Sequence, residues 1–200
     1  LGIDKRELGL EKYVELTRQR IRDGILPKAA DKDSPLVPVL NSYRPFLMTK
    51  DVDYVTTRNI IPLGKSHLNA MVYRSQDEVN AVKKLEEWDW VKCFSPNDTK
   101  INFKIPYDYG PQKHLYEPDF MVKLENDLIV LLEIKGTGGE IYGEDRDKVN
   151  AKNAAAKKWV EAVNNHGRLG RWAFDIARSE VELEEKLKAF LDTSDGKAVA

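Results

Sequence analysis

The sequence has a single cysteine, Cys93. One thiol cannot form a disulfide within the chain or supply a cysteine-based zinc site. Cys93 lies in an apolar stretch, where we expect a core residue. No apolar run is long enough to cross a membrane and no signal peptide is evident, so we expect a cytoplasmic protein with no membrane partner.

The chain also lacks an excess of basic charge, because its formal net charge is -1. Binding to nucleic acid would need a local basic face or help from another part of a larger protein. No ATP-binding motif is present: the glycine-rich segment 137–145 contains three acidic residues and no Lys-Ser/Thr pair typical of a phosphate loop. The chain starts abruptly at Leu1, and we expect a fragment of a larger protein.

With 200 residues, of which 42% are hydrophobic and 32% are charged, the composition is that of a globular protein. We expect a helix and a proline-rich arm over 1–50, one α/β domain over 51–193, and a frayed tail over 194–200. Sequence periodicity predicts helices over 8–23, 75–87, 145–165 and 179–191, and strands over 51–57, 68–73, 90–94, 101–107, 119–124, 128–135 and 171–176. Segments 107–116 and 137–145 are predicted to be loops.

The most informative stretch is the pair of strands predicted over 119–124 and 128–135. The short polar link between them suits a hairpin turn. The second strand is almost entirely apolar, as expected for the centre of a sheet, yet it ends in Glu133 and Lys135. These two residues share a face, and the hairpin brings Asp119 beside it. Because unpaired buried charge is costly, a divalent metal ion would resolve the conflict.

These residues resemble the signature of the PD-(D/E)xK nuclease superfamily, Pro118-Asp119 followed by Glu133-Ile134-Lys135. The resemblance implies that Asp119, Glu133 and the carbonyl of Ile134 bind Mg²⁺ or Mn²⁺. It implies that Lys135 positions or activates the attacking water. The plainer reading is a hairpin with a surface aspartate and a Glu/Lys pair at its rim.

Glu78 has two readings. It stands three residues after Ser75, which makes a capping box at the start of the predicted helix. In the nuclease superfamily an acidic residue on the helix before the signature often joins the metal site. We therefore expect Glu78 to be a third metal ligand, with the helix cap as the alternative.

A longer set of short blocks is similar to one branch of that superfamily: the C-terminal endonuclease domain of the helicase–nuclease (Res) subunit of type III restriction enzymes. The similarity covers roughly residues 35–176. Its blocks are Lys65-Ser66-His67-Leu68-Asn69, Ser75-Gln76-Asp77-Glu78, the signature itself, Lys152 with Ala155, Ala156, Trp159, Ala162, Val163 and Asn164, and Gly170-Arg171-Trp172. Two features depart from that branch: the helicase motor is absent, and the loop after Gly136 is longer and more acidic.

This resemblance implies a restriction-endonuclease-like core, with a mixed β-sheet flanked by helices and an N-terminal helical or irregular extension. It implies metal-dependent cleavage of DNA. The expected partners are DNA, a helicase/ATPase portion of the same parent protein, and a methyltransferase (modification) subunit. Lys148, Lys152 and Arg171 are the candidates for phosphate contacts, although a solvated face explains any single lysine as well. For His67, we favour a structural hydrogen bond.

Two rival functions remain open. One is a non-catalytic module that binds nucleic acid or docks a partner subunit. The other is a nuclease that acts on RNA or structured junctions, since a hydrolytic core reads phosphate and not base. The complete set Asp119, Glu133 and Lys135 favours a catalytic site over a decayed one.

Overall fold

The computed structural model describes residues 35–38, 49–136 and 146–192. The chain divides into two units, Leu1–Pro35 and Leu36–Ala200, and every described residue except Pro35 belongs to the second. The helix predicted over 8–23, most of the proline-rich arm, the glycine-rich segment 137–145 and the tail 194–200 lie outside the described residues.

The centre of the second unit is a mixed four-stranded sheet with the order β3-β6-β7-β8. Its strands are β3 (Val91–Pro96), β6 (Phe120–Leu124), β7 (Leu128–Ile134) and β8 (Arg171–Ala177). The first three are antiparallel neighbours, and β8 runs parallel to β7. The prediction that the apolar run forms an interior strand is therefore confirmed.

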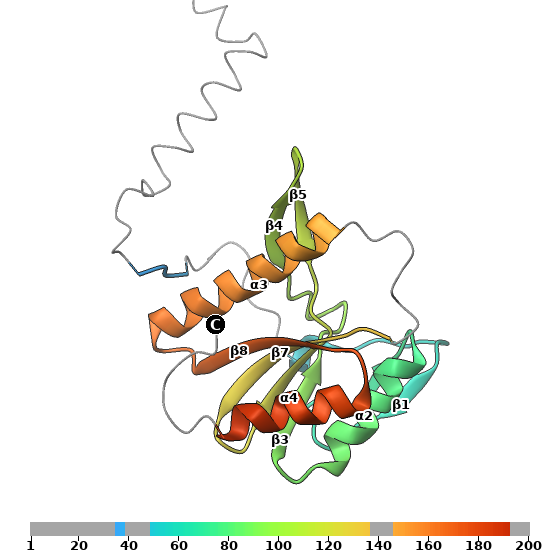
Figure 1. Cartoon of the computed structure of the whole chain (residues 1–200). Coiled ribbons are helices and arrows are strands. Elements are labelled where there is room, and N and C mark those ends of the chain that lie inside the picture. Colours follow the sequence, from blue (N-terminus) through green and yellow to red (C-terminus); the bar gives the residue numbers. More distant parts are fainter. Residues whose placement is uncertain (1–34, 39–48, 137–145, 193–200) are drawn as a thin grey trace, which may run out of the picture. The chain divides into compact units, whose positions relative to one another are not determined.

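Strand β7 contributes to two apolar layers, one on each face of the sheet. Val130 and Leu132 belong to one buried cluster, while Leu131 belongs to the other, and all three are fully buried. Helices α2 (Gln76–Glu87) and α4 (Glu180–Asp192) pack on the first cluster. Helix α3 (Arg146–His166) packs on the second (Figure 1). The prediction of a mixed sheet flanked by helices is confirmed.

The turn between β6 and β7 forms as its polar residues predict. Asp127 has a positive φ of 62° and donates its N–H to the Leu124 carbonyl over 3.0 Å. The Asn126 side chain accepts the N–H of Leu128 over 3.1 Å. The tight turn fixes the register of the two strands, which decides which side chains face each other at their far ends.

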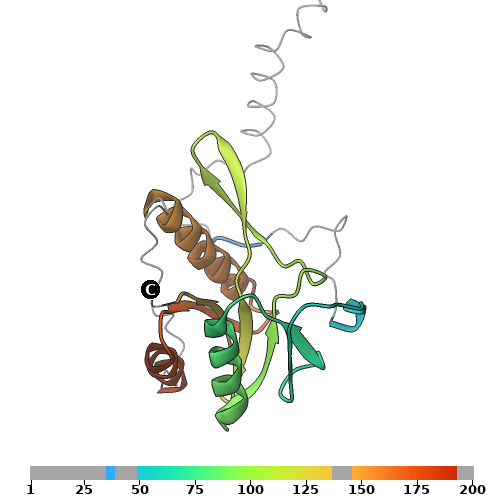
Figure 2. The ribbon, with the colours of Figure 1, turned by 90° about the vertical axis from the view of Figure 1, so that its right-hand side faces the viewer.

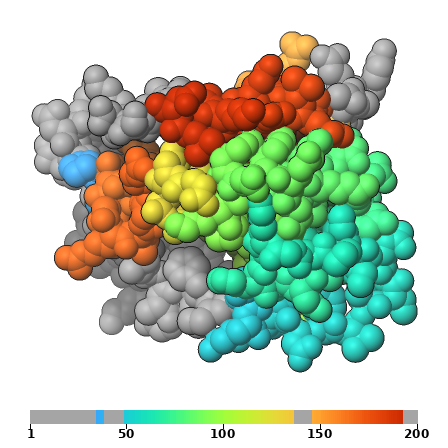
Figure 3. All heavy atoms as spheres, turned by 90° about the horizontal axis from the view of Figure 1, so that it is seen from below, coloured from blue at the N-terminus to red at the C-terminus, as the bar shows by residue number. Residues whose placement is uncertain are grey.

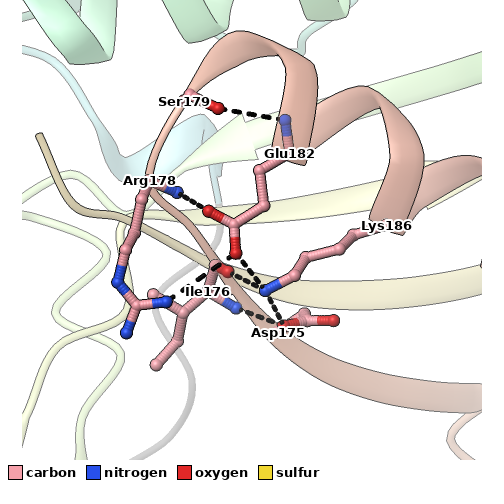
Figure 4. A network of polar contacts seen from close by, with 6 residues as sticks. All are labelled: Asp175, Ile176, Arg178, Ser179, Glu182 and Lys186. Carbon is pink, nitrogen blue, oxygen red and sulfur yellow. Dashed lines mark hydrogen bonds and ion pairs between the residues drawn. The ribbon is translucent and has the colours of Figure 1, made fainter. Parts of the chain in front are cut away.

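Helices α2 and α4 begin with the same local motif. Ser75 and Ser179 each accept the N–H of a glutamate three residues later, over 3.2 and 3.1 Å. Each glutamate in turn accepts the N–H of the arginine before the serine. In α4, the glutamate is Glu182, and it also binds Lys186, which reaches Asp175 at the end of β8 (Figure 4). This network ties the start of α4 to the sheet.

Two smaller hairpins differ from the prediction. No strand forms over 51–57, where Thr49–Asp51 is a short 3-10 turn (η2) and irregular chain follows. Instead β1 (Ile60–Pro62), which was not predicted, pairs with β2 (Ala70–Val72). Residues 51–57 alternate in the way a strand would, but none of the described strands pairs with them. A strand needs such a partner to satisfy its backbone hydrogen bonds, so this segment stays irregular.

The second difference concerns residues 101–116. The predicted strand starts four residues late, as β4 (Ile105–Tyr109), because Asn102 adopts a positive φ of 54° that interrupts an extended chain. The predicted loop contains β5 (Gln112–Tyr116), paired with β4 through a turn at Gly110, whose φ is 60°. Figure 2 shows this hairpin extending beyond α3. None of the described helices is long and apolar enough to cross a membrane.

Candidate active site

Asp119 and Glu133 face each other at adjoining strand ends. The β6–β7 register ends with Phe120 paired with Leu132, and the Asp119 N–H donates to the Leu132 carbonyl over 3.1 Å, so Asp119 lies beside the end of β7 that carries Glu133. The charge of Glu133 contributes to the raised pKa of Asp119, as expected for two nearby carboxylates. The Ile134 N–H donates to Asp119 Oδ2 over 2.7 Å, so the carboxylate takes the place of a backbone acceptor where the ladder ends. The structure therefore brings these two carboxylates together.

Asn97 holds the segment that carries Asp119. Its backbone N–H donates to the Asp119 carbonyl over 2.8 Å, and its side-chain amide donates to the Pro118 carbonyl over 3.0 Å. The same side chain bonds both backbone groups of Phe103. In the sequence, Asn97 is typical of a turn. Its role in holding the Asp119 segment depends on contacts with distant residues, which no local pattern indicates.

Lys152 reaches the carboxylates from α3. Its Nζ lies 2.5 Å from Glu133 Oε1 and 4.6 Å from the centre of the Tyr116 ring. Both partners of the ion pair are mostly buried, with 17% and 10% of their side chains exposed. Lys152 was a candidate phosphate contact, with a solvated helix face as the alternative; in this structure it forms a mostly buried ion pair with Glu133.

Two buried oxygen atoms near this ion pair lack a hydrogen-bond partner among the described residues: Glu133 Oε2 and the Tyr116 hydroxyl. The pKa of Tyr116 is raised by burial, by the charge of nearby Glu133 and by a polar contact with the Glu133 carboxylate. The phenol therefore keeps its proton, and it lies close enough to Glu133 to interact with it.

The pKa of Asp119 is raised to about 7. Burial is the largest cause, followed by the charge of Glu133 and, more weakly, that of Glu78. The hydrogen bond from Ile134 and the charge of Lys152 act in the opposite direction without cancelling the rise. Beside the charge of Glu133, Asp119 thus resists ionisation.

Glu78 caps α2 and lies near Asp119, while its role as a metal ligand stays a prediction. Its Oε2 accepts the N–H of Arg74 over 2.7 Å, so it does cap α2, although through the residue before Ser75. It also contributes to the raised pKa of Asp119, and both side chains line one hollow of about 180 Å³. Glu182 makes the same cap in α4 and binds Lys186, which shows that the cap alone requires no metal site.

Lys135 lies one residue beyond the end of β7. Its N–H donates to the Ala177 carbonyl over 2.8 Å, which continues the pairing with β8. It is half-buried and, with Ile134, borders a second hollow of about 400 Å³ near the starts of α2 and α4. Lys135 is not among the residues that line the hollow shared by Asp119 and Glu78.

The other predicted phosphate contacts are scattered. Lys148 is half-buried on α3, one turn before Lys152. Arg171 opens β8 opposite Leu128, at the end of the sheet remote from Glu133, and donates to the Asn126 carbonyl over 2.7 Å. His67 is exposed between β1 and β2. The structure brings neither Arg171 nor His67 to the carboxylates.

Comparison of the chain with known proteins finds no relative. No protein-family model, curated protein or solved structure matches it. Its function is therefore inferred from the chemistry of this site.

The donor set fits a hard divalent cation in part. A group of at least three His, Cys, Asp or Glu side chains that could hold a metal ion is absent from residues 35–38, 49–136 and 146–192. Mg²⁺, however, is commonly held by one or two carboxylates, with water and substrate phosphate completing its shell. The neighbouring carboxylates of Asp119 and Glu133 fit that pattern, and Glu133 Oε2 is buried with no hydrogen bond to the described part of the chain.

The buried ion pair gives a first test. Replacing Lys152 with Met should destabilise the protein by about 2–4 kcal/mol in chelator, because Glu133 is left buried without its cation. Urea unfolding measures the change. Lys148→Met, one turn away on the same helix, is the matched control and should cost under about 1 kcal/mol. Equal stability of the two variants would show that the ion pair contributes nothing.

The raised pKa of Asp119 gives a second test. Since its folded pKa of about 7 exceeds the value near 4 of an unfolded aspartate, the folded state holds the proton more tightly. Its contribution therefore destabilises the fold progressively as pH rises from 4 to 7, and fully above 7. Asp119→Asn should remove this penalty and stabilise the chelated protein at pH 8 by on the order of 1–3 kcal/mol, with the gain vanishing near pH 4.

Thermal melts of wild type and variant across that pH range measure the difference. Asp108→Asn, a change at an exposed position in the β4–β5 hairpin, is the control and should show no such trend. An Asp119→Asn variant that is less stable than wild type at pH 8 would mean that Asp119 is a structural ion-pair partner.

Proposed function

We propose that this chain is a metal-dependent endonuclease domain that hydrolyses DNA phosphodiester bonds, built on a restriction-endonuclease-like core. The observation that carries the proposal is the convergence of Asp119 and Glu133 at adjoining strand ends, with Asp119 lining a hollow. The raised pKa of Asp119 supports it, because a divalent cation would favour the charged carboxylate. Glu133 Oε2, which has no hydrogen bond among the described residues, could bind the same cation.

Asp119 and Glu133 would hold the cation, with the Ile134 carbonyl and Glu78 as further oxygen donors. Bound Mg²⁺ or Mn²⁺ polarises a phosphate oxygen and lowers the pKa of water, which is what phosphodiester hydrolysis requires. Hard oxygen donors suit both ions.

The surrounding residues prepare the carboxylates. The Ile134 N–H fixes one oxygen of Asp119 and leaves the other available. Lys152 fixes one oxygen of Glu133 in the same way. Lys135 is proposed to stabilise the charge that develops on the phosphate, because it follows Glu133 by two residues and lies at the same edge of the sheet.

The partners are proposed from the resemblance to type III restriction enzymes. They are a helicase/ATPase portion of the same parent protein and a methyltransferase subunit, which would supply ATP hydrolysis and target recognition. Nothing in the hydrolytic core itself distinguishes one base sequence from another.

The test combines cleavage with metal binding. Wild type should nick supercoiled plasmid in Mg²⁺ or Mn²⁺ and not in chelator, and saturating Mn²⁺ should stabilise it by on the order of 2–3 kcal/mol. Asp119→Asn should lose both effects while remaining folded, whereas the control Asp108→Asn should keep both.

Two outcomes would contradict the proposal. One is nicking by Asp119→Asn at the wild-type rate, which would place the activity elsewhere. The other is a wild-type protein whose melting temperature does not respond to Mn²⁺ and which does not cut, because a carboxylate pair that binds no cation cannot support this chemistry.

A further inference from the structure

Two arginines lie just beyond the open end of the β1–β2 hairpin. The register pairs Ile60 with Val72, and the bond from the Tyr73 N–H to the Asn59 carbonyl is 3.4 Å long. Arg58 and Arg74 follow at bends where this pairing stops, and both line the same hollow.

Neither guanidinium group is neutralised within the described part of the chain. The described ion pairs include neither Arg58 nor Arg74. Their backbone N–H groups are engaged, with Thr56 Oγ1 and with Glu78 Oε2, which fixes the chain at both positions. Both side chains are exposed, and no carboxylate among the described residues forms an ion pair with either.

Both arginines line the hollow that Asp119 and Glu78 also line. Two other acidic residues of this hollow already have partners: Asp98 accepts the Tyr54 hydroxyl over 2.6 Å, and Glu117 pairs with Lys104 over 2.7 Å. Figure 3 shows the cyan to blue-green atoms that follow residue 49 lying against the green atoms of the next segments. The hollow is therefore lined by Arg58 and Arg74 from the ends of the β1–β2 hairpin, by Glu78 from α2 and by Asp119 from the start of β6.

We propose that Arg58 and Arg74 form a phosphate-binding subsite that guides a DNA strand across the β1–β2 hairpin to Asp119. Guanidinium groups bind phosphate through paired hydrogen bonds, and phosphate would supply the counter-charge that the arginine pair lacks. This inference rests on the proposed function for the identity of the ligand, but DNA binding at the subsite does not require cleavage.

The subsite also explains how a chain with a net charge of -1 could attract DNA. A protein with no general attraction for DNA needs cations concentrated where the strand passes. Arg58 and Arg74 supply them beside the carboxylates. Arg171, whose guanidinium binds the Asn126 carbonyl at the other end of the sheet, does not.

Binding without metal isolates this claim. A fluorescein-labelled duplex of about 20 base pairs is titrated with protein in low-salt chelator buffer, where no metal-dependent cleavage occurs, and anisotropy reports binding. Arg58→Gln with Arg74→Gln should weaken binding at least tenfold, as expected for two charged hydrogen-bond donors. The dependence of log K on log salt should become shallower by about 1.8, the value for two duplex phosphate contacts. Arg171→Gln is the matched control and should bind as wild type does.

The outcomes separate the subsite from the enzyme. Asp119→Asn should bind DNA at least as tightly as wild type even where it abolishes nicking, so DNA binding without cleavage would remove the proposed function and leave the subsite standing. The subsite is overturned if the double variant binds like wild type, if Arg171→Gln weakens binding as much, or if wild type does not bind DNA at low salt.

Discussion

Two carboxylates on neighbouring strand ends, partly or wholly withdrawn from water, are the constraint on which the rest of this structure depends. Asp119 and Glu133 come together because a tight turn sets the β6–β7 register, and Asp119 immediately precedes the strand at the end of that ladder. Their mutual repulsion, added to burial, raises the pKa of Asp119 to about 7. A fold selected only for stability gains nothing from such a pair, so its cost points to function.

The scaffold limits this cost from three directions. Within the sheet, the Ile134 N–H binds Asp119 where the ladder ends. From one face, α3 delivers Lys152 to Glu133, with the Tyr116 ring beneath the ammonium group. From the edge, Asn97 ties the Pro118–Asp119 segment to the neighbouring chain. Each contact fixes an atom of the pair and still leaves Glu133 Oε2 without a partner among the described residues.

Sequence patterns predicted those features of the fold that depend on residues close together in the chain. The apolar run of β7 and its short turn were sufficient to predict an interior strand. The predicted convergence of Asp119, Glu133 and Lys135 is seen for the two carboxylates, whereas Lys135 borders the other hollow, near the starts of α2 and α4. The cap of α2 was equally visible, since Ser75 and Glu78 are three residues apart. Even so, the backbone group that Glu78 binds belongs to Arg74 and not to Ser75.

Contacts between distant segments could not be predicted in this way. The pairing of Lys152 with Glu133 depends on how α3 crosses the sheet, and the arginine pair depends on β1, whose three residues carry too little pattern to identify a strand. The β4–β5 hairpin was missed because Gly110 and Pro111 read as a loop, whereas Gly110 forms a tight turn. In each case tertiary packing decided between local alternatives of similar energy.

The central claim is that Asp119 and Glu133 are arranged to share a divalent cation. The most direct measurement is the pH titration of the Asp119 carboxyl carbon by ¹³C NMR, with and without Mg²⁺. The account predicts a midpoint near pH 7 in chelator, falling by at least about one unit when Mg²⁺ is bound, because the ion favours the charged carboxylate. A midpoint near 4 in chelator, unchanged by Mg²⁺, would contradict it.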